Sequence, residues 1–245
     1  MNRLKNVKVF DTARELNEAA ARFCLIIANE AISKRGRFTF CLSGGSTPRG
    51  LYALLSSEPC KNKFPWNNTF LFWGDERCVP FQDGRNNAHM AYETLIDKVA
   101  IPGSNIFPIP VDLPPFDAAQ EYEQTILQFF VEEQPCFDLI LLGLGEDGHT
   151  ASLFPGTSVL NEKKRLVKEV IVDDDRLNRI TMTAPLINMA HHILFLVSGA
   201  NKAEILSKVT TISTQPPQFP AQLITPQNGD LTWYVTLNKN MNAER

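Results

Sequence analysis

The stretch 143–155, GLGEDGHTASLFP, carries the side chains best suited to chemistry in this chain. His149 follows Asp147 by two residues, and a histidine beside a carboxylate is a natural general base near neutral pH. Three glycines within six residues permit a tight turn that would hold both side chains at the mouth of a sheet. We therefore expect His149 to be a general base, with Asp147 or another carboxylate orienting its ring. A loop or capping histidine is the simpler alternative.

A second candidate is the turn at 43–48, SGGSTP, which lies between an apolar run and a predicted helix. The N–H groups at a helix N-terminus carry partial positive charge and can hold a phosphate without a metal. Neither the GxxxxGK[ST] loop nor the GxGxxG turn is present. An ordinary Gly-Ser turn is the alternative. The residues expected to face a phosphate are Gly44, Gly45, Ser46 and Thr47.

Cations that could meet an anion lie in three other segments. Arg77 belongs to a charged run, 74–80, that directly follows an apolar strand, and its planar fork suits a phosphate or carboxylate. Asp75 in the same run could position that anion or bind sugar hydroxyls. Lys202 falls in the first turn of a predicted helix, where a cation is unfavourable unless it meets an anion. Arg179 is a further candidate, and solvated surface positions are the alternative for each cation.

Several features argue against a metal, a disulfide framework and a membrane anchor. No second histidine stands four residues from His149, and metal binding needs three or more clustered ligands. The five cysteines are scattered, odd in number and without CxxC spacing, which fits a reducing cytosol. The N-terminus does not resemble a signal peptide, and no apolar stretch approaches the ~18 residues of a membrane span. We expect a cytoplasmic protein without metal or cofactor.

The charge balance bears on the partner. The net charge is −3 and no Lys/Arg cluster appears, so we expect no nucleic-acid surface. An anionic small-molecule substrate would then be attracted by a local site and not by the field of the whole protein. The sequence leaves the oligomeric state open, with a monomer or weak dimer expected.

Strands and helices alternate along the chain, which predicts an α/β doubly wound fold in a single domain, 1–245. The apolar strand at 137–143 should lie at the centre of a parallel sheet. Ligands bind beyond the carboxyl ends of such strands, so the segments at 43–48, 74–80, 143–155 and 198–202 should converge on one crevice. The expected strands are 37–43, 69–74, 137–143, 179–183, 192–199 and 231–236. The expected helices are 11–34, 48–57, 86–99, 116–133 and 201–209, and 213–227 is expected to be a surface excursion.

These residues describe a pocket with a phosphate cradle, two or three cations and a histidine. The combination suits a sugar-phosphate hydrolase or isomerase, and residue types alone do not separate the two. A non-catalytic sugar-phosphate sensor is a third hypothesis, although no DNA-binding or interaction module is visible in the sequence.

Five segments resemble the 6-phosphogluconolactonase family over about residues 8–236: LSGGSTPRGLY, FLFWGDERCVP, LILLGLGEDGHTASLFPG, RITMTAPLIN and FLVSGANKAEIL. The run at 145–155 is highly specific, whereas GGSTP and DERCVP are shared in looser form with glucosamine-6-phosphate isomerases. The resemblance implies a modified Rossmann-like α/β fold, with a mostly parallel central sheet flanked by helices on both faces. It also implies hydrolysis of 6-phosphogluconolactone in the oxidative pentose phosphate pathway. An isomerase or deaminase that uses Asp75 to move a proton is the alternative.

The resemblance also assigns positions. His149 matches the family's catalytic histidine, and Asp75 and Arg77 match its acidic and basic loop positions. Arg179, Lys202 and the turn 44–47 match positions near the phosphate. Departures from the family pattern occur at Asn86 and Ala88, where Ser and Tyr are usual, at 174–178, where a proline pair is usual, and at Thr236, where Asp is common. They concern the pocket rim and a C-terminal contact, and leave His149 untouched.

Overall fold

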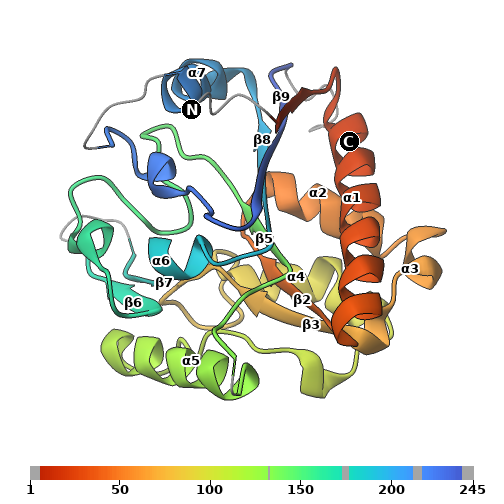
Figure 1. Ribbon diagram of the computed structural model, residues 1–245, viewed down its shortest axis with the longest axis horizontal. Coiled ribbons are helices and arrows are strands. Elements are labelled where there is room, and N and C mark those ends of the chain that lie inside the picture. The colour runs from red at the N-terminus through yellow and green to blue at the C-terminus, as the bar shows by residue number, and fades with distance from the viewer. Residues whose placement is uncertain (1–5, 132, 173–176, 212–216, 239–245) are drawn as a thin grey trace.

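The computed structural model describes residues 6–131, 133–172, 177–211 and 217–238. Its centre is a six-stranded parallel sheet in the order β1-β9-β8-β5-β2-β3 (Figure 1). β5 is buried at every position and lies between β8 and β2, as its unbroken apolar sequence predicts. The strands are β1 (Val7–Val9), β2 (Phe38–Leu42), β3 (Thr69–Trp73), β5 (Leu139–Leu142), β8 (His192–Ser198) and β9 (Asp230–Thr236).

Helices flank this sheet, which confirms the predicted fold class. α1 packs against β2 and β9, and Figure 1 shows α1 and α2 along one side of the sheet with α6 along the other. α1 begins where Thr12 accepts a hydrogen bond from the Glu15 N–H, and it ends at Gly36 in the left-handed region, φ 74°. The helices are α1 (Ala13–Arg35), α2 (Ser46–Leu55), α3 (Cys60–Lys63), α4 (Asn87–Thr94), α5 (Pro115–Phe129), α6 (Ala184–Ile187) and α7 (Ala203–Thr211). Short 3₁₀ turns are η2 (Trp66–Asn68), η3 (Ile96–Lys98), η4 (Gly103–Asn105), η5 (Ser158–Asn161), η6 (Ala200–Lys202) and η7 (Pro220–Leu223).

A second, smaller sheet was not predicted from the sequence and corrects one expectation. Residues 75–77, expected as a polar loop, form β4 (Asp75–Arg77), and β7 (Arg179–Met182) pairs with β4 and not with the central sheet. The antiparallel order is β4-β7-β6, with β6 (Val167–Val170) at one edge. Propensity does not reveal this sheet, because its strands are three or four residues long and meet only through tertiary contacts.

Element ends also differ from the sequence-based expectation. α2 begins two residues early because Gly45, at φ 105°, takes the N-cap position and places Ser46 and Thr47 in the first turn. Part of 213–227 is packed rather than peripheral: the Ala221 N–H donates to the Gly148 carbonyl, and Phe219 lies against Gly148. Residues 213–216 of the predicted segment lie outside the described residues.

The strand order creates a switch point between β2 and β5. The chain continues from β2 to β3 on one side and from β5 to β8 on the other, so the connections diverge at the carboxyl ends of this central pair. Parallel α/β sheets bind ligands at such a point. The predicted convergence of loops therefore has a topological cause.

Two buried tyrosines hold the strand ends from which loops leave this edge. The Tyr52 hydroxyl accepts from the Ser43 N–H at 2.9 Å and donates to the Ser43 carbonyl at 2.8 Å. Tyr122 does the same for Trp73 at the end of β3, at 2.8 and 3.0 Å. Both tyrosines are 0 % exposed, so no water can replace these bonds.

Tyr52→Phe should therefore lower the free energy of unfolding by about 2–4 kcal/mol, because two buried backbone groups each lose their partner. Urea denaturation measures the change. Tyr92→Phe is the matched control, since the half-buried Tyr92 hydroxyl makes no hydrogen bond within the described residues. Equal stability of the two variants would show that the Tyr52 hydroxyl does not support the strand end.

Candidate active site

A cavity of about 410 Å³ opens at the switch point. All four segments that were expected to converge contribute to it, which confirms that expectation. Asn87, from the start of α4, closes part of the wall, and Gly44 allows its close approach: a Cβ at position 44 would lie 1.8 Å from the Asn87 Oδ1. The lining residues are Ser43, Gly44, Asp75, Arg77, Asn87, Gly143, Leu144, Gly145, His149, Thr150, Ala151, Ser152, Phe154, Arg179 and Lys202.

Most predicted site residues share this cavity, and a few do not. Asp147 is absent from the lining but contacts His149 directly. Gly45, Ser46 and Thr47 form the N-cap and first turn of α2 and do not line the cavity, so their contact with a phosphate stays a prediction. Those that line it are Gly44, Asp75, Arg77, His149, Arg179 and Lys202.

His149 is held by Asp147 on one side of its ring. Its Nδ1 lies 2.5 Å from the Asp147 Oδ1, and its backbone N–H donates to the same oxygen at 3.1 Å. The Phe154 ring packs 4.7 Å from the imidazole, centroid to centroid. Burial works against the charge on Asp147, yet these hydrogen bonds and the imidazole hold the pKa of Asp147 below its usual value. Because Nδ1 is engaged, Nε2 is the nitrogen left to exchange a proton in the cavity.

The glycines around His149 are required by space and backbone angle. A Cβ at Gly145 would lie 2.1 Å from the His149 Nδ1 and 2.8 Å from the Asp147 Oδ1. Gly148 has φ 81°, and a Cβ there would lie 2.7 Å from the Phe219 ring. Glycine at these positions therefore lets the imidazole fold back against its own loop.

Gly145→Ala should displace the imidazole and lower turnover by about 10²-fold, because a misplacement on the order of 1 Å has an effect of that size. Steady-state kinetics measure it. Gly103→Ala is the control, since Gly103 lies in η4, away from the cavity, and a Cβ at that position would meet nothing within 4 Å. Unchanged turnover in Gly145→Ala would show that the ring has room to shift without harm.

Three cations line the cavity, two from the small sheet and one from η6. Arg77 and Arg179 are opposite each other in the β4–β7 register, and each donates to a nearby backbone carbonyl. Burial, and then the charge of Arg77, lower the pKa of Arg179 from its usual value. An anion between the two guanidinium groups would relieve that repulsion. Lys202 ends η6, with its Nζ 4.0 Å from the Glu146 Oε1.

The partner of Asp75 is not evident from the sequence. Asp75 is 8 % exposed, and its Oδ2 accepts a hydrogen bond from the Ser152 hydroxyl at 2.6 Å. Its backbone carbonyl accepts from the Asn87 side-chain amide at 3.0 Å. The position of Ser152 within the ASLFP run was the only available signal, and it does not indicate which carboxylate the serine meets.

Glu76 is buried in the protein interior, whereas its neighbour Asp75 lines the cavity. Successive strand residues point to opposite faces, and Glu76 is 1 % exposed and does not line the cavity. Its carboxylate accepts from the N–H groups of Arg77, Asn87 and Ala88, each at 2.8 Å. It thus joins β4 to the start of α4. Burial raises the pKa of Glu76 to about 7, against the opposing effect of these hydrogen bonds.

This raised pKa predicts a pH-dependent contribution to stability. The folded protein holds the Glu76 proton more tightly than the unfolded chain, so the contribution is fully present below pH 4.5 and is lost as the pH rises through about 7. Glu76→Gln removes the titration. Over this range the variant should gain up to about 3 kcal/mol relative to the wild type, at about 1.4 kcal/mol per pKa unit. Urea denaturation at several pH values measures it, and parallel curves would contradict it.

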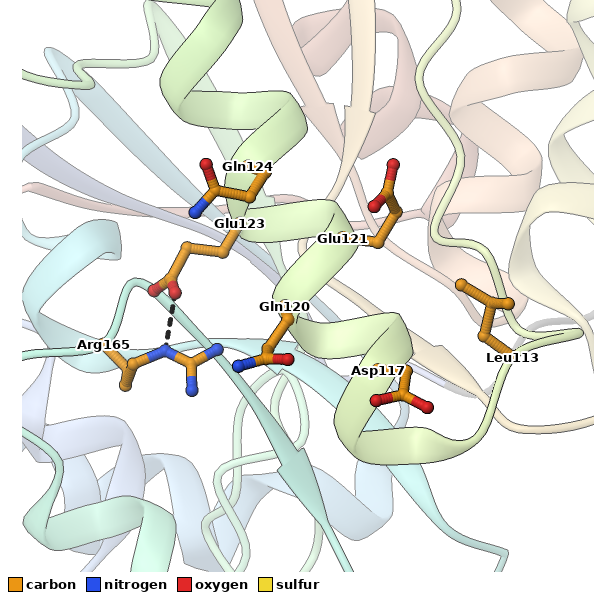
Figure 2. A pocket seen from close by; sticks show the side chains of 7 residues that line it. All are labelled: Leu113, Asp117, Gln120, Glu121, Glu123, Gln124 and Arg165. Carbon is orange, nitrogen blue, oxygen red and sulfur yellow. Dashed lines mark hydrogen bonds and ion pairs between the residues drawn. The ribbon is translucent and has the colours of Figure 1, made fainter.

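A larger cavity, of about 610 Å³, lies over α5 (Figure 2) and holds none of the predicted site residues. Figure 2 shows the Arg165 guanidinium bonded to Glu123, with an Nε–Oε2 distance of 2.5 Å. The other Glu123 oxygen accepts from the N–H groups of Leu166 and Val167. These bonds join α5 to the start of β6. We therefore assign Glu123 and Arg165 a structural role. Its lining comprises Leu113, Asp117, Gln120, Glu121, Glu123, Gln124 and Arg165.

Among the described residues there is no cluster of potential metal ligands and no helix suited to span a membrane. Within 6–131, 133–172, 177–211 and 217–238, no three His, Cys, Asp or Glu side chains gather as a metal site would require. In the same ranges, none of the helices combines the length and apolar character needed to cross a membrane.

Comparison with known proteins gives consistent matches. Residues 11–233 match the model of a family described as glucosamine-6-phosphate isomerases/6-phosphogluconolactonase. The chain is 44 % identical to a 6-phosphogluconolactonase of Synechocystis (84 % of this chain, 85 % of the relative) and 40 % identical to one of Nostoc (94 % and 95 %). The solved 6-phosphogluconolactonase of Trypanosoma cruzi superposes with a TM-score of 0.84 at 28 % identity, covering 96 % of each chain.

Proposed function

Because this chain belongs to the glucosamine-6-phosphate isomerase/6-phosphogluconolactonase family, we propose that it hydrolyses 6-phosphogluconolactone to 6-phosphogluconate, the second step of the oxidative pentose phosphate pathway. It is a lactone-hydrolysing enzyme, like the relatives that are 40–44 % identical over most of its length. The observation that carries the mechanism is the 2.5 Å contact of Asp147 with His149, whose ring lines a cavity together with Arg77, Arg179 and Lys202.

The substrate is bound by its phosphate and hydrolysed at its ring ester. Arg77, Arg179 and Lys202, which line the cavity, attract the phosphate. By this proposal the N–H groups of the turn 44–47 complete its binding, although only Gly44 of that turn lines the cavity. The Nε2 of His149 takes a proton from water, and the resulting hydroxide attacks C1 of the lactone. Asp147 fixes the tautomer of the ring and stabilises the imidazolium. As the tetrahedral intermediate collapses, the C1–O bond of the ring breaks and His149 returns the proton to the departing oxygen.

A sugar-phosphate isomerase or deaminase is the second candidate function, because Asp75 places a carboxylate in the same cavity. Such a reaction would use Asp75 to move a proton between C1 and C2. Incubation with glucosamine 6-phosphate and measurement of ammonia tests it directly. The lactonase is favoured by the names of the relatives with 40–44 % identity.

The setting of the enzyme is also a proposal. We infer a single catalytic domain over 1–245, working in the cytoplasm as a monomer or weak dimer, without cofactor or nucleic acid. The net charge of −3 and the absence of paired cysteine spacings support it.

His149→Ala should lower turnover by about 10²–10⁴-fold, the usual contribution of a general base. The lactone is generated in situ with glucose-6-phosphate dehydrogenase, and its decay is followed with and without protein and with a chelator. The protein-free reaction is essential because the lactone also hydrolyses unaided. His89→Ala is the matched control, since His89 lies on α4 outside the cavity lining.

Acceleration that survives the chelator, persists in His89→Ala and is lost in His149→Ala would establish a metal-free general base. Near-normal turnover of His149→Ala would remove the assigned role. No acceleration by the folded wild type would overturn the lactonase and leave the isomerase to be tested.

A further inference from the structure

Ser152 connects the loop 143–155 to the small sheet. It is 0 % exposed, and it makes two hydrogen bonds to facing residues of β4 and β7. Its hydroxyl donates to the Asp75 Oδ2 at 2.6 Å, and its N–H donates to the Thr181 hydroxyl at 3.2 Å. Asp75 and Thr181 are direct cross-strand partners. The loop that carries His149 is therefore tied to the strand that carries Asp75.

Asp75 has capacity to accept another hydrogen bond. A carboxylate offers two oxygens, and the side-chain bond described above occupies only Oδ2. Asp75 lines the cavity at 8 % exposure, and its negative charge would repel the substrate phosphate. A sugar lactone also presents hydroxyl groups. These groups donate strong hydrogen bonds to a buried carboxylate. The Asp75 Oδ1 therefore suits the hydroxyl-bearing part of the substrate.

We propose that Ser152 is a positioning residue, whose hydroxyl orients the Asp75 carboxylate so that Oδ1 accepts a hydrogen bond from a ring hydroxyl of the lactone. The inference rests on the proposed function and deepens it, because it assigns recognition of the sugar to Asp75. Ser152 itself is fully buried, so its oxygen acts through Asp75 and does not attack the substrate.

A double-mutant cycle tests this inference through Ser152→Ala, Asp75→Asn and the combined variant. A hydrogen bond to a hydroxyl is present in both ground and transition state, so each single change should raise KM about 10-fold or more while kcat changes much less. Because Ser152 acts through Asp75, the double variant should be no worse than Asp75→Asn. Ser152→Cys keeps the approximate volume with a weaker donor and should give an intermediate KM.

A second buried hydroxyl–carboxylate pair provides the control. The Thr39 hydroxyl donates to the Asp138 Oδ2 at 2.8 Å, and neither residue lines the cavity. Both are almost completely buried, like Ser152. Thr39→Val should lower the melting temperature and leave KM and kcat unchanged. A purely structural Ser152 would give the same pattern.

The outcomes are distinguishable. Turnover of the lactone by the wild type tests the proposed function. If the wild type shows no turnover, the proposed function and this inference both fail. With an active wild type, non-additive increases in KM support the inference. Additive effects of the two single changes, a loss confined to kcat, or unchanged kinetics in Ser152→Ala would each overturn it.

Discussion

The carboxyl edge of the parallel sheet is the constraint on which the candidate site depends. Parallel strands end on the same side of the sheet. Residues separated by more than a hundred positions in the chain therefore meet where the connections after β2 and β5 leave in opposite directions. The loops can meet there only if the backbone groups at the strand ends are satisfied without water. Tyr52 and Tyr122 do this with single hydroxyls, each bonded to the N–H and the carbonyl of one residue. The site is thus supported by rigid strand ends and not by the loops alone.

Charge is arranged locally in a protein whose net charge is −3. Arg77 and Arg179 face each other because β4 and β7 are antiparallel partners, and their proximity costs energy until an anion arrives. The carboxylates near the cavity are each engaged with a partner: Asp147 with His149, Asp75 with Ser152, and Glu146 with Asn201 and Lys202. Attraction for the phosphate and hydrogen bonding to the rest of the substrate are thereby assigned to different side chains of the same wall.

The small sheet gives neighbouring residues opposite tasks. Asp75 and Glu76 are adjacent in sequence, but strand geometry turns one toward the cavity and the other into the interior, where it binds the first N–H groups of α4. A loop at this place, as the sequence suggests, would not separate the two carboxylates so sharply. Pairing of β4 with β7 brings Thr181 opposite Asp75, and both residues contact Ser152.

The sequence by itself determined the local features: the apolar strand at 137–143, the long first helix, and the glycines that place His149 beside Asp147 two residues away. These depend on residue type and short spacing, which act without the rest of the chain. The family match and the alternation of the longer strands and helices followed from the same information, whereas the short strands β1, β4 and β6 were not predicted. Only the tertiary structure decided that Arg77 faces Arg179, that Ser152 meets Asp75, and that Phe219 covers Gly148. Those contacts join segments far apart in the sequence, and short strands and buried hydroxyls carry too little local preference to reveal their partners.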